Sequence, residues 1–317
     1  MQRINIILRC VFVGLLAMVF FVGCSNLVQQ GTNSEDRLEL KSIRVNDTTL
    51  HYVERGQGTP VVFVHGALGD YRTWDGQIET FSEKYRVISY SLRYHYPNEY
   101  PQDSVVFPRP DHVEDLKEFL DVLDIRPVHL VGHSGGGAYS LLFARDYPEY
   151  LISLTLAEPA VTELLATTPE GVSARQSFDD TVVSPSTAAF QVGDDEEGVR
   201  LFINGVMGKE NAFESLPANF REGMMQNVHT MRSSRLDKTP RTRPRSSFSC
   251  EDGGQIRIPT MLILGELSPK MFVVINDTLE RCLPNVERAT LRDSSHGLEM
   301  ENPGDFNEMV LLFLSKH

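Results

Sequence analysis

A serine flanked by glycines is the part of the sequence with the plainest chemical potential. Residues 132–136 read Gly-His-Ser-Gly-Gly, which is a Gly-x-Ser-x-Gly pattern directly after the apolar run Val128–Val131. A serine on a sharp turn between a buried strand and a helix projects its hydroxyl above the sheet. Gly132 and Gly136 allow backbone segments to pass close by on either side of the turn. Ser134 is therefore the candidate nucleophile.

His296 is the candidate base for this serine, because a serine hydroxyl is a poor nucleophile until a base takes its proton. It stands in the segment Asp293–Gly297, between the last expected strand and the last expected helix, and so at a strand end. His65 and His133 also lie near the predicted chemistry. His133 is expected to point away from its neighbour Ser134, and His65 to shape the loop after a central strand.

Cleavage of an acyl bond also needs hydrogen-bond donors for the oxyanion of the tetrahedral intermediate. The segment Val64–Ala67 follows a central strand, and Gly135 follows the candidate nucleophile. We predict that the main-chain N–H groups of Ala67 and Gly135 converge on one oxygen atom.

The elements that must position these residues alternate between strand and helix. The predicted strands are Leu38–Arg44, Thr49–Arg55, Val61–Val64, Arg86–Tyr90, Val128–Val131, Ile152–Ala157, Thr260–Leu264 and Val286–Leu291. The predicted helices are Asp111–Asp124, Gly135–Asp146, Met271–Arg281 and Pro303–Leu314. The first two strands suit an antiparallel edge pair. The alternation predicts an α/β fold with a mainly parallel central sheet and helices on both faces.

Residues 160–257 interrupt the alternation, and the strand pattern resumes directly afterwards. They include a helical pattern over Ala212–Val228. An insertion between two strands of one sheet is expected to cover the strand ends, so we predict a mostly helical cap. The core then comprises residues 38–159 and 258–317, and a second independent domain is the alternative.

These motifs together resemble the α/β-hydrolase fold family. The resemblance rests on His65-Gly66, the turn at 132–136 and Ser295-His296-Gly297, and it runs from about residue 38 to the C-terminus in the family's order. It implies a nucleophile, an acid and a histidine in that chain order. A serine nucleophile implies cleavage of an ester, lactone or related acyl bond of a small molecule. The epoxide hydrolase and haloalkane dehalogenase branches place Asp at this turn instead.

The acid is the point at which the sequence departs from that family. The usual place for the acid, four residues into the segment Gly265-Glu266-Leu267-Ser268, holds Ser268. Some members place the acid after the strand that follows the turn helix, and Glu158 stands there. We favour a Ser134–His296–Glu158 triad, with Glu266 and Asp293 as alternatives, because without an acid the imidazole tautomer is not fixed.

Three other functions remain open at this stage. The missing Asp at position 268 favours a non-catalytic, lipid-anchored binding protein on a hydrolase scaffold, whereas the presence of both Ser134 and His296 speaks against it. An acyltransferase and a C–C hydrolase would use the same triad.

Composition excludes some classes of ligand and partner. The 317 residues contain 30 Lys and Arg against 43 Asp and Glu, for a formal net charge of −13. A net negative chain is a poor ligand for nucleic acid, so no nucleic-acid partner is expected. No His and Cys grouping has zinc spacing, and we expect neither a metal nor an organic cofactor. Nothing in the sequence fixes the oligomeric state.

The first residues have the features of an export signal. Two arginines precede an apolar run, and the sequence Phe21-Val22-Gly23-Cys24 follows. This resembles the signal of bacterial lipoproteins, in which cleavage before the cysteine leaves a lipid-modified N-terminus. We therefore expect a signal peptide over 1–23, lipidation at Cys24 and a polar tether over 24–37. The resemblance implies an exported protein anchored to a membrane, at the bacterial outer membrane or periplasmic face.

Two further cysteines, Cys250 and Cys282, would remain in the mature chain. An exported protein permits a disulfide between them. Two separate buried thiols are the alternative, because spacing alone does not show whether the residues meet.

Overall fold

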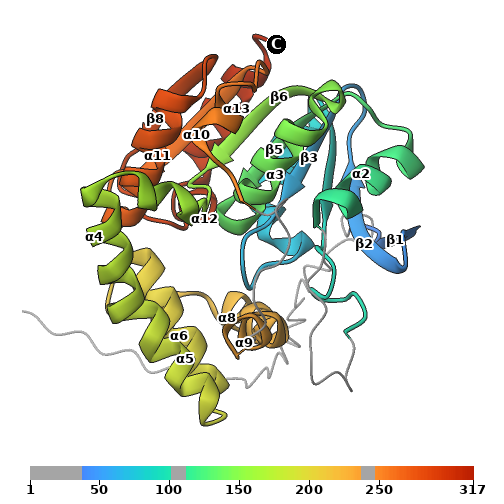
Figure 1. Cartoon of the computed structure of the whole chain (residues 1–317). Helices are drawn as coiled ribbons and strands as arrows, with labels where there is room; N and C mark the ends of the chain where they lie inside the picture. The colour runs from blue at the N-terminus through green and yellow to red at the C-terminus, as the bar shows by residue number, and fades with distance from the viewer. Residues whose placement is uncertain (1–37, 101–111, 237–246) are drawn as a thin grey trace, which may run out of the picture. The chain divides into compact units, whose positions relative to one another are not determined.

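The computed structural model describes residues 38–100, 112–236 and 247–317 (Figure 1). Within these residues one sheet has eight strands in the order β1-β2-β4-β3-β5-β6-β7-β8. The strands are β1 (Lys41–Val45), β2 (Thr48–Arg55), β3 (Pro60–Val64), β4 (Arg86–Tyr90), β5 (Val128–His133), β6 (Leu151–Ala157), β7 (Thr260–Gly265) and β8 (Val286–Leu291). β1 and β2 pair antiparallel, as do β2 and β4, and every other neighbouring pair is parallel. The predicted mainly parallel sheet and antiparallel edge pair are confirmed.

Both faces of the sheet are buried at the central strand β3, which is why its residues are apolar without interruption. Val62 and Val64 pack in one hydrophobic cluster, and Val61 and Phe63 in another. The first cluster contains side chains of helices α2 (His112–Leu123), α3 (Ser134–Asp146) and α11 (Lys270–Cys282). The second contains side chains of α1 (Asp75–Ser82) and α13 (Pro303–Leu314). Helices therefore cover both faces, as the sequence predicts.

Helix α1 was not predicted from the sequence. It follows a short 3-10 helix, η1 (Tyr71–Trp74), whose first turn is capped by the side chain of Asp70. Only two apolar side chains of α1, Ile78 and Phe81, are buried. Such a short element shows too little of the helical repeat to be recognised from sequence.

The segment between β6 and β7 is helical, as predicted for a cap (Figure 1, green to orange). Its described helices are η3 (Thr162–Thr167), α4 (Pro169–Phe178), η4 (Asp179–Val183), α5 (Ser184–Gln191), α6 (Asp195–Met207), α7 (Ala212–Ser215), α8 (Ala218–Gln226), α9 (Val228–Leu236) and α10 (Cys250–Gly253). The single helix predicted over Ala212–Val228 is wrong. Leu216 is extended, with ψ of 145°, because the residue before a proline avoids the helical region, and Pro217 separates α7 from α8.

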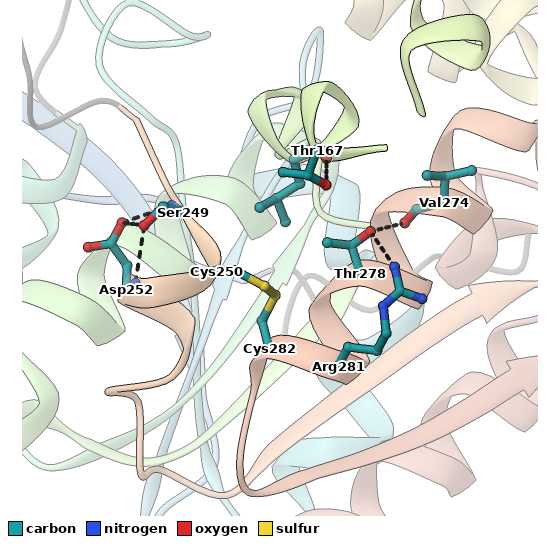
Figure 2. The surroundings of a disulfide bond; sticks show 9 residues. Thr167, Ser249, Cys250, Asp252, Val274, Thr278, Arg281 and Cys282 are labelled. Carbon is teal, nitrogen blue, oxygen red and sulfur yellow. Dashed lines mark hydrogen bonds between the residues drawn. A yellow bond between two sulfur atoms is a disulfide. The ribbon is translucent and has the colours of Figure 1, made fainter. Parts of the chain in front are cut away.

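A disulfide joins the last helix of this insertion to the core (Figure 2). Cys250 is the first residue of α10 and Cys282 the last of α11, with their Cα atoms 5.0 Å apart. Of the two arrangements that the sequence left open, the structure has the disulfide.

The N-terminal predictions, namely the signal over 1–23, lipidation of Cys24 and the tether over 24–37, lie outside the described residues. So does Asp111, the first residue of the helix predicted over Asp111–Asp124. In the part of the chain that is described, no helix has the length and apolar character needed to cross a membrane.

Candidate active site

Ser134 stands on the sharp turn between β5 and α3. Its backbone has a φ of +52°, in the left-handed region that residues other than glycine seldom adopt. The turn is tight because the loop after β3 lies against it. A Cβ added to Gly136 would lie 2.4 Å from the carbonyl oxygens of Val64 and His65, so only glycine fits there. The residue is partly exposed, as a nucleophile must be.

The imidazole of His296 lies beside this hydroxyl. His296 belongs to the loop between β8 and the short helix α12 (Leu298–Glu301), and its Nε2 is 2.9 Å from Ser134 Oγ. The ring of Phe272, on α11, stacks on it with centroids 3.9 Å apart. Burial lowers the pKa of His296, and its hydrogen bond to the Glu158 carboxylate opposes this only in part. The neutral imidazole that a general base requires is thus the favoured form at neutral pH.

Glu158 follows β6, is fully buried and has a φ of +46°. Its Oε2 is 2.7 Å from His296 Nδ1. Its Oε1 accepts hydrogen bonds from the Gly265 N–H, at 2.7 Å, and from the Ser268 hydroxyl. A carboxylate that receives several hydrogen bonds is held in one orientation. Ser268 occupies the place at which the resemblance expects an Asp, and here it donates to the carboxylate that reaches the histidine from another strand.

The alternative acids lie elsewhere. The carboxylate of Glu266 accepts a hydrogen bond from the Asp293 N–H at 3.1 Å, and both residues are exposed. Of the three carboxylates considered from sequence, the structure brings Glu158 to His296.

The two predicted oxyanion donors lie at adjoining turns. Gly135 is in the first turn of α3, where backbone N–H groups have no carbonyl partner within the helix. A Cβ added to Gly135 would have the Ala67 nitrogen as its nearest neighbour, at 3.9 Å. One added to Gly66 would lie 3.0 Å from the Cβ of Ser134. The loop that carries Ala67 therefore lies close to Gly135 and Ser134.

His65 shapes this loop, as expected. Its Nε2 accepts a hydrogen bond from the Leu92 N–H at 2.9 Å, so its Nδ1 carries the proton and donates to the Gly66 carbonyl at 2.8 Å. Burial lowers the pKa of His65 to about 4. Both ring nitrogens are thus occupied by backbone groups.

His133 stabilises the loop that carries His296. Its Nε2 donates to the His296 carbonyl at 2.7 Å, and its Nδ1 lies 3.2 Å from a carboxylate oxygen of the buried Glu299. Burial raises the pKa of Glu299. Sequence reasoning missed Glu299 because nothing in a short helix with two acidic residues distinguishes the buried one. Phe272 was missed for a similar reason, since it reads as an ordinary core residue of α11.

Within the described residues no group of His, Cys, Asp and Glu side chains is arranged to hold a metal ion.

This fold and this arrangement of side chains define an α/β hydrolase. Residues 59–303 match the family model described as alpha/beta hydrolase fold. The match spans well over half of the chain, and the chain belongs to that family. The family resemblance seen in the sequence is confirmed.

Known relatives and one solved structure agree with this assignment. Epoxide hydrolase 4 of Mus musculus is 27% identical over 292 residues, which cover 86% of this chain and 79% of that protein. The uncharacterized carboxylesterase nap of Bacillus subtilis (strain 168) is 26% identical over 261 residues, which cover 81% of this chain and 79% of that protein. The solved structure of Est816, described as an N-acyl homoserine lactone degrading enzyme, matches with a TM-score of 0.67 at 20% identity. The match covers 86% of this chain and 100% of that one. At that identity the likeness concerns the fold, while the relatives support a hydrolase activity.

Proposed function

We propose that this protein is a serine hydrolase that cleaves an ester or lactone bond of a small molecule. Ser134 is the nucleophile, His296 the general base and acid, and Glu158 the carboxylate that orients the histidine. The proposal rests on one continuous chain of hydrogen bonds. Ser134 Oγ lies 2.9 Å from His296 Nε2, and His296 Nδ1 lies 2.7 Å from Glu158 Oε2.

The proposed reaction has two halves. Ser134 Oγ attacks the carbonyl carbon while His296 Nε2 takes its proton, and the N–H groups of Ala67 and Gly135 hold the oxyanion. The intermediate collapses, the C–O bond breaks, and His296 returns the proton to the leaving alcohol. Water then loses a proton to His296 and attacks the acyl carbon. The second collapse releases the carboxylic acid and restores the Ser134 hydroxyl.

The nucleophile favours an ester or lactone over an epoxide as the substrate. Although epoxide hydrolase 4 is a relative, the resemblance places Asp at the turn in the epoxide-opening branch, and this chain has Ser134 there. The relative nap is named as a carboxylesterase and Est816 is described as a lactone-degrading enzyme, and both support acyl chemistry.

The test combines covalent labelling with turnover. We expect a fluorophosphonate probe to label the protein at Ser134, and p-nitrophenyl esters or acyl-homoserine lactones to be hydrolysed. Ser134→Ala should remove both signals without changing thermal unfolding, and Ser315→Ala, at the exposed end of α13, is the matched control. Full esterase activity in Ser134→Ala would refute the nucleophile. Neither labelling nor turnover in the wild type would favour a non-catalytic binding protein.

We further propose that the protein is exported and anchored by a lipid on Cys24. The support is the basic and then apolar N-terminal sequence, together with the Cys250–Cys282 disulfide, because disulfides persist mainly in oxidising compartments. Metabolic labelling with palmitate should mark the wild type and the Cys10→Ala control, but not Cys24→Ala. Labelling that survives in Cys24→Ala would refute the anchor.

A further inference from the structure

A buried asparagine of the cap makes most of its hydrogen bonds with the core. Asn227 lies between α8 and α9 and has 0% of its surface exposed. Its Oδ1 accepts from the Tyr96 N–H at 2.7 Å. Its Nδ2 donates to Asp70 Oδ2 at 2.9 Å, with longer contacts to the carbonyls of Leu68 at 3.3 Å and Gly223 at 3.1 Å. Three of these four partners belong to the loops after β3 and β4.

The loop after β3 is the one that carries the Ala67 N–H, and its backbone is strained beside that residue. Leu68 has a φ of +61° and is 1% exposed. A branched residue stays in the left-handed region only where its surroundings over-determine that conformation. Asn227 supplies two such constraints, since it binds the Leu68 carbonyl and the Asp70 side chain two residues further on.

Asp70 is itself held firmly, so it is a fixed point for this loop. Its carboxylate receives hydrogen bonds from Arg72 Nε at 2.8 Å and Nη2 at 2.6 Å. Burial raises the pKa of Asp70, but its bonds to Arg72 outweigh burial, and the net pKa is lowered. Arg72 Nη2 also donates to Gln226 Oε1 at 2.7 Å, which is a second link to the end of α8.

We propose that Asn227 is a positioning residue for the oxyanion site, so that the Ala67 N–H reaches its working orientation only when the cap is seated on the core. This inference rests on the proposed serine-hydrolase function. In this proposal the cap stabilises the transition state by positioning the loop at 66–70, and not solely by enclosing the substrate.

The test is Asn227→Ala, which removes the four side-chain hydrogen bonds of Asn227 and leaves those of Arg72 in place. We expect kcat for a p-nitrophenyl ester to fall about ten- to a hundredfold, with KM changed by less than about threefold, because misplacing one oxyanion donor weakens transition-state binding. A trifluoromethyl ketone forms a tetrahedral adduct with the serine, and its affinity should fall by the same factor.

Ser186→Ala is the matched control. Ser186 is also fully buried in the cap, but its hydroxyl donates to the Gly198 carbonyl, at 2.7 Å, inside the cap itself. It should lower thermal stability while kcat and ketone affinity stay near those of the wild type. Equal losses in both variants would overturn the proposal, as would wild-type kcat and ketone affinity in folded Asn227→Ala.

Asn227→Asp keeps the shape of the side chain and the acceptor for the Tyr96 N–H, and it serves if the alanine variant does not fold. The ionised aspartate has no N–H groups to donate to Asp70 and Leu68, whereas its protonated form has one O–H donor. The ratio of variant to wild-type kcat should therefore rise as the pH falls, and a ratio independent of pH would contradict the proposal. A wild type that is neither labelled by fluorophosphonate nor active on esters would instead refute the serine-hydrolase function.

Discussion

At the scale of single residues, the two oxygens of Glu158 have different partners, and this decides what a substitution there does. Oε1 accepts from the Gly265 N–H and the Ser268 hydroxyl, whereas Oε2 faces His296 Nδ1. In Glu158→Gln the amide oxygen keeps the two donors, so the NH₂ group turns towards the imidazole. The histidine must then present an acceptor at Nδ1 and carry its proton on Nε2, where it can no longer accept a proton from Ser134.

We therefore expect Glu158→Gln to lower kcat by about 10⁴, the loss typical of a wrong tautomer. Glu266→Gln changes an exposed carboxylate on the neighbouring strand-end loop and should leave kcat within about twofold. Steady-state kinetics on a p-nitrophenyl ester, with thermal unfolding as the check on folding, compares the two. A large loss in Glu266→Gln with activity kept in Glu158→Gln would reverse the assignment of the acid.

The site residues that could be predicted from the sequence are those that follow a strand. Ser134 and Glu158 each follow a mostly apolar strand, and His296 follows the mixed strand Val286–Leu291. Parallel strands bring their carboxyl ends to one edge of the sheet. Phe272 and Asn227 were not predicted, because their contacts with the site depend on how side chains of different elements meet. Ser268 was noticed as a departure from the family pattern, but its hydrogen bond to Glu158 becomes visible only in three dimensions.

At the scale of elements, predictions that depended on a local sequence pattern mostly succeeded, and questions that depended on contacts between elements stayed open. The central strand β3 was recovered because a buried strand reads as a short, apolar run, whereas β1, β2 and β8 mix apolar and polar residues. The helix predicted over Ala212–Val228 was wrong because the apolar spacing continues across Pro217 while the backbone does not. The pairing of Cys250 with Cys282 could not be derived, since it depends on where the last cap helix lies against α11.

That disulfide links two elements at a place remote from the chemistry. Cys282 is ten residues after Phe272 on α11, which is about 15 Å along a helix. We expect replacing both cysteines with serine to lower the free energy of unfolding by about 2–4 kcal/mol, because the bond closes a loop with a sequence separation of 32. The kcat of the folded enzyme should stay within about twofold.

Urea unfolding with and without reductant measures this effect. Reductant should destabilise the wild type and leave the double serine variant unchanged, which separates the Cys250–Cys282 bond from other effects of the reagent. A wild type whose unfolding midpoint is the same in both conditions would show that the bond does not contribute.

At the scale of the whole molecule, several buried histidines link folding stability to pH. Burial lowers the pKa of His65 and His129 to about 4 and that of His112 to about 3, and it also lowers the pKa of His95. In the unfolded chain these groups take up protons as the pH falls through about 6.5. Below that pH the unfolded state binds more protons than the folded state, so folding stability falls as the pH decreases from about 6.5 towards 4.

His112 offers the clearest test of this linkage. Its ring lies 4.5 Å from that of Tyr139, and its Nδ1 has no hydrogen-bond partner among the described residues. His112→Phe keeps an aromatic ring there and removes one titrating group. Between pH 6.5 and 4 the unfolding free energy of the variant should therefore fall less steeply than that of the wild type, by up to about 1.4 kcal/mol per pH unit. Urea unfolding at several pH values measures both slopes, with the exposed His317→Phe as the control. Parallel slopes for His112→Phe and the wild type would mean that His112 takes up its proton in the folded protein as readily as in the unfolded chain.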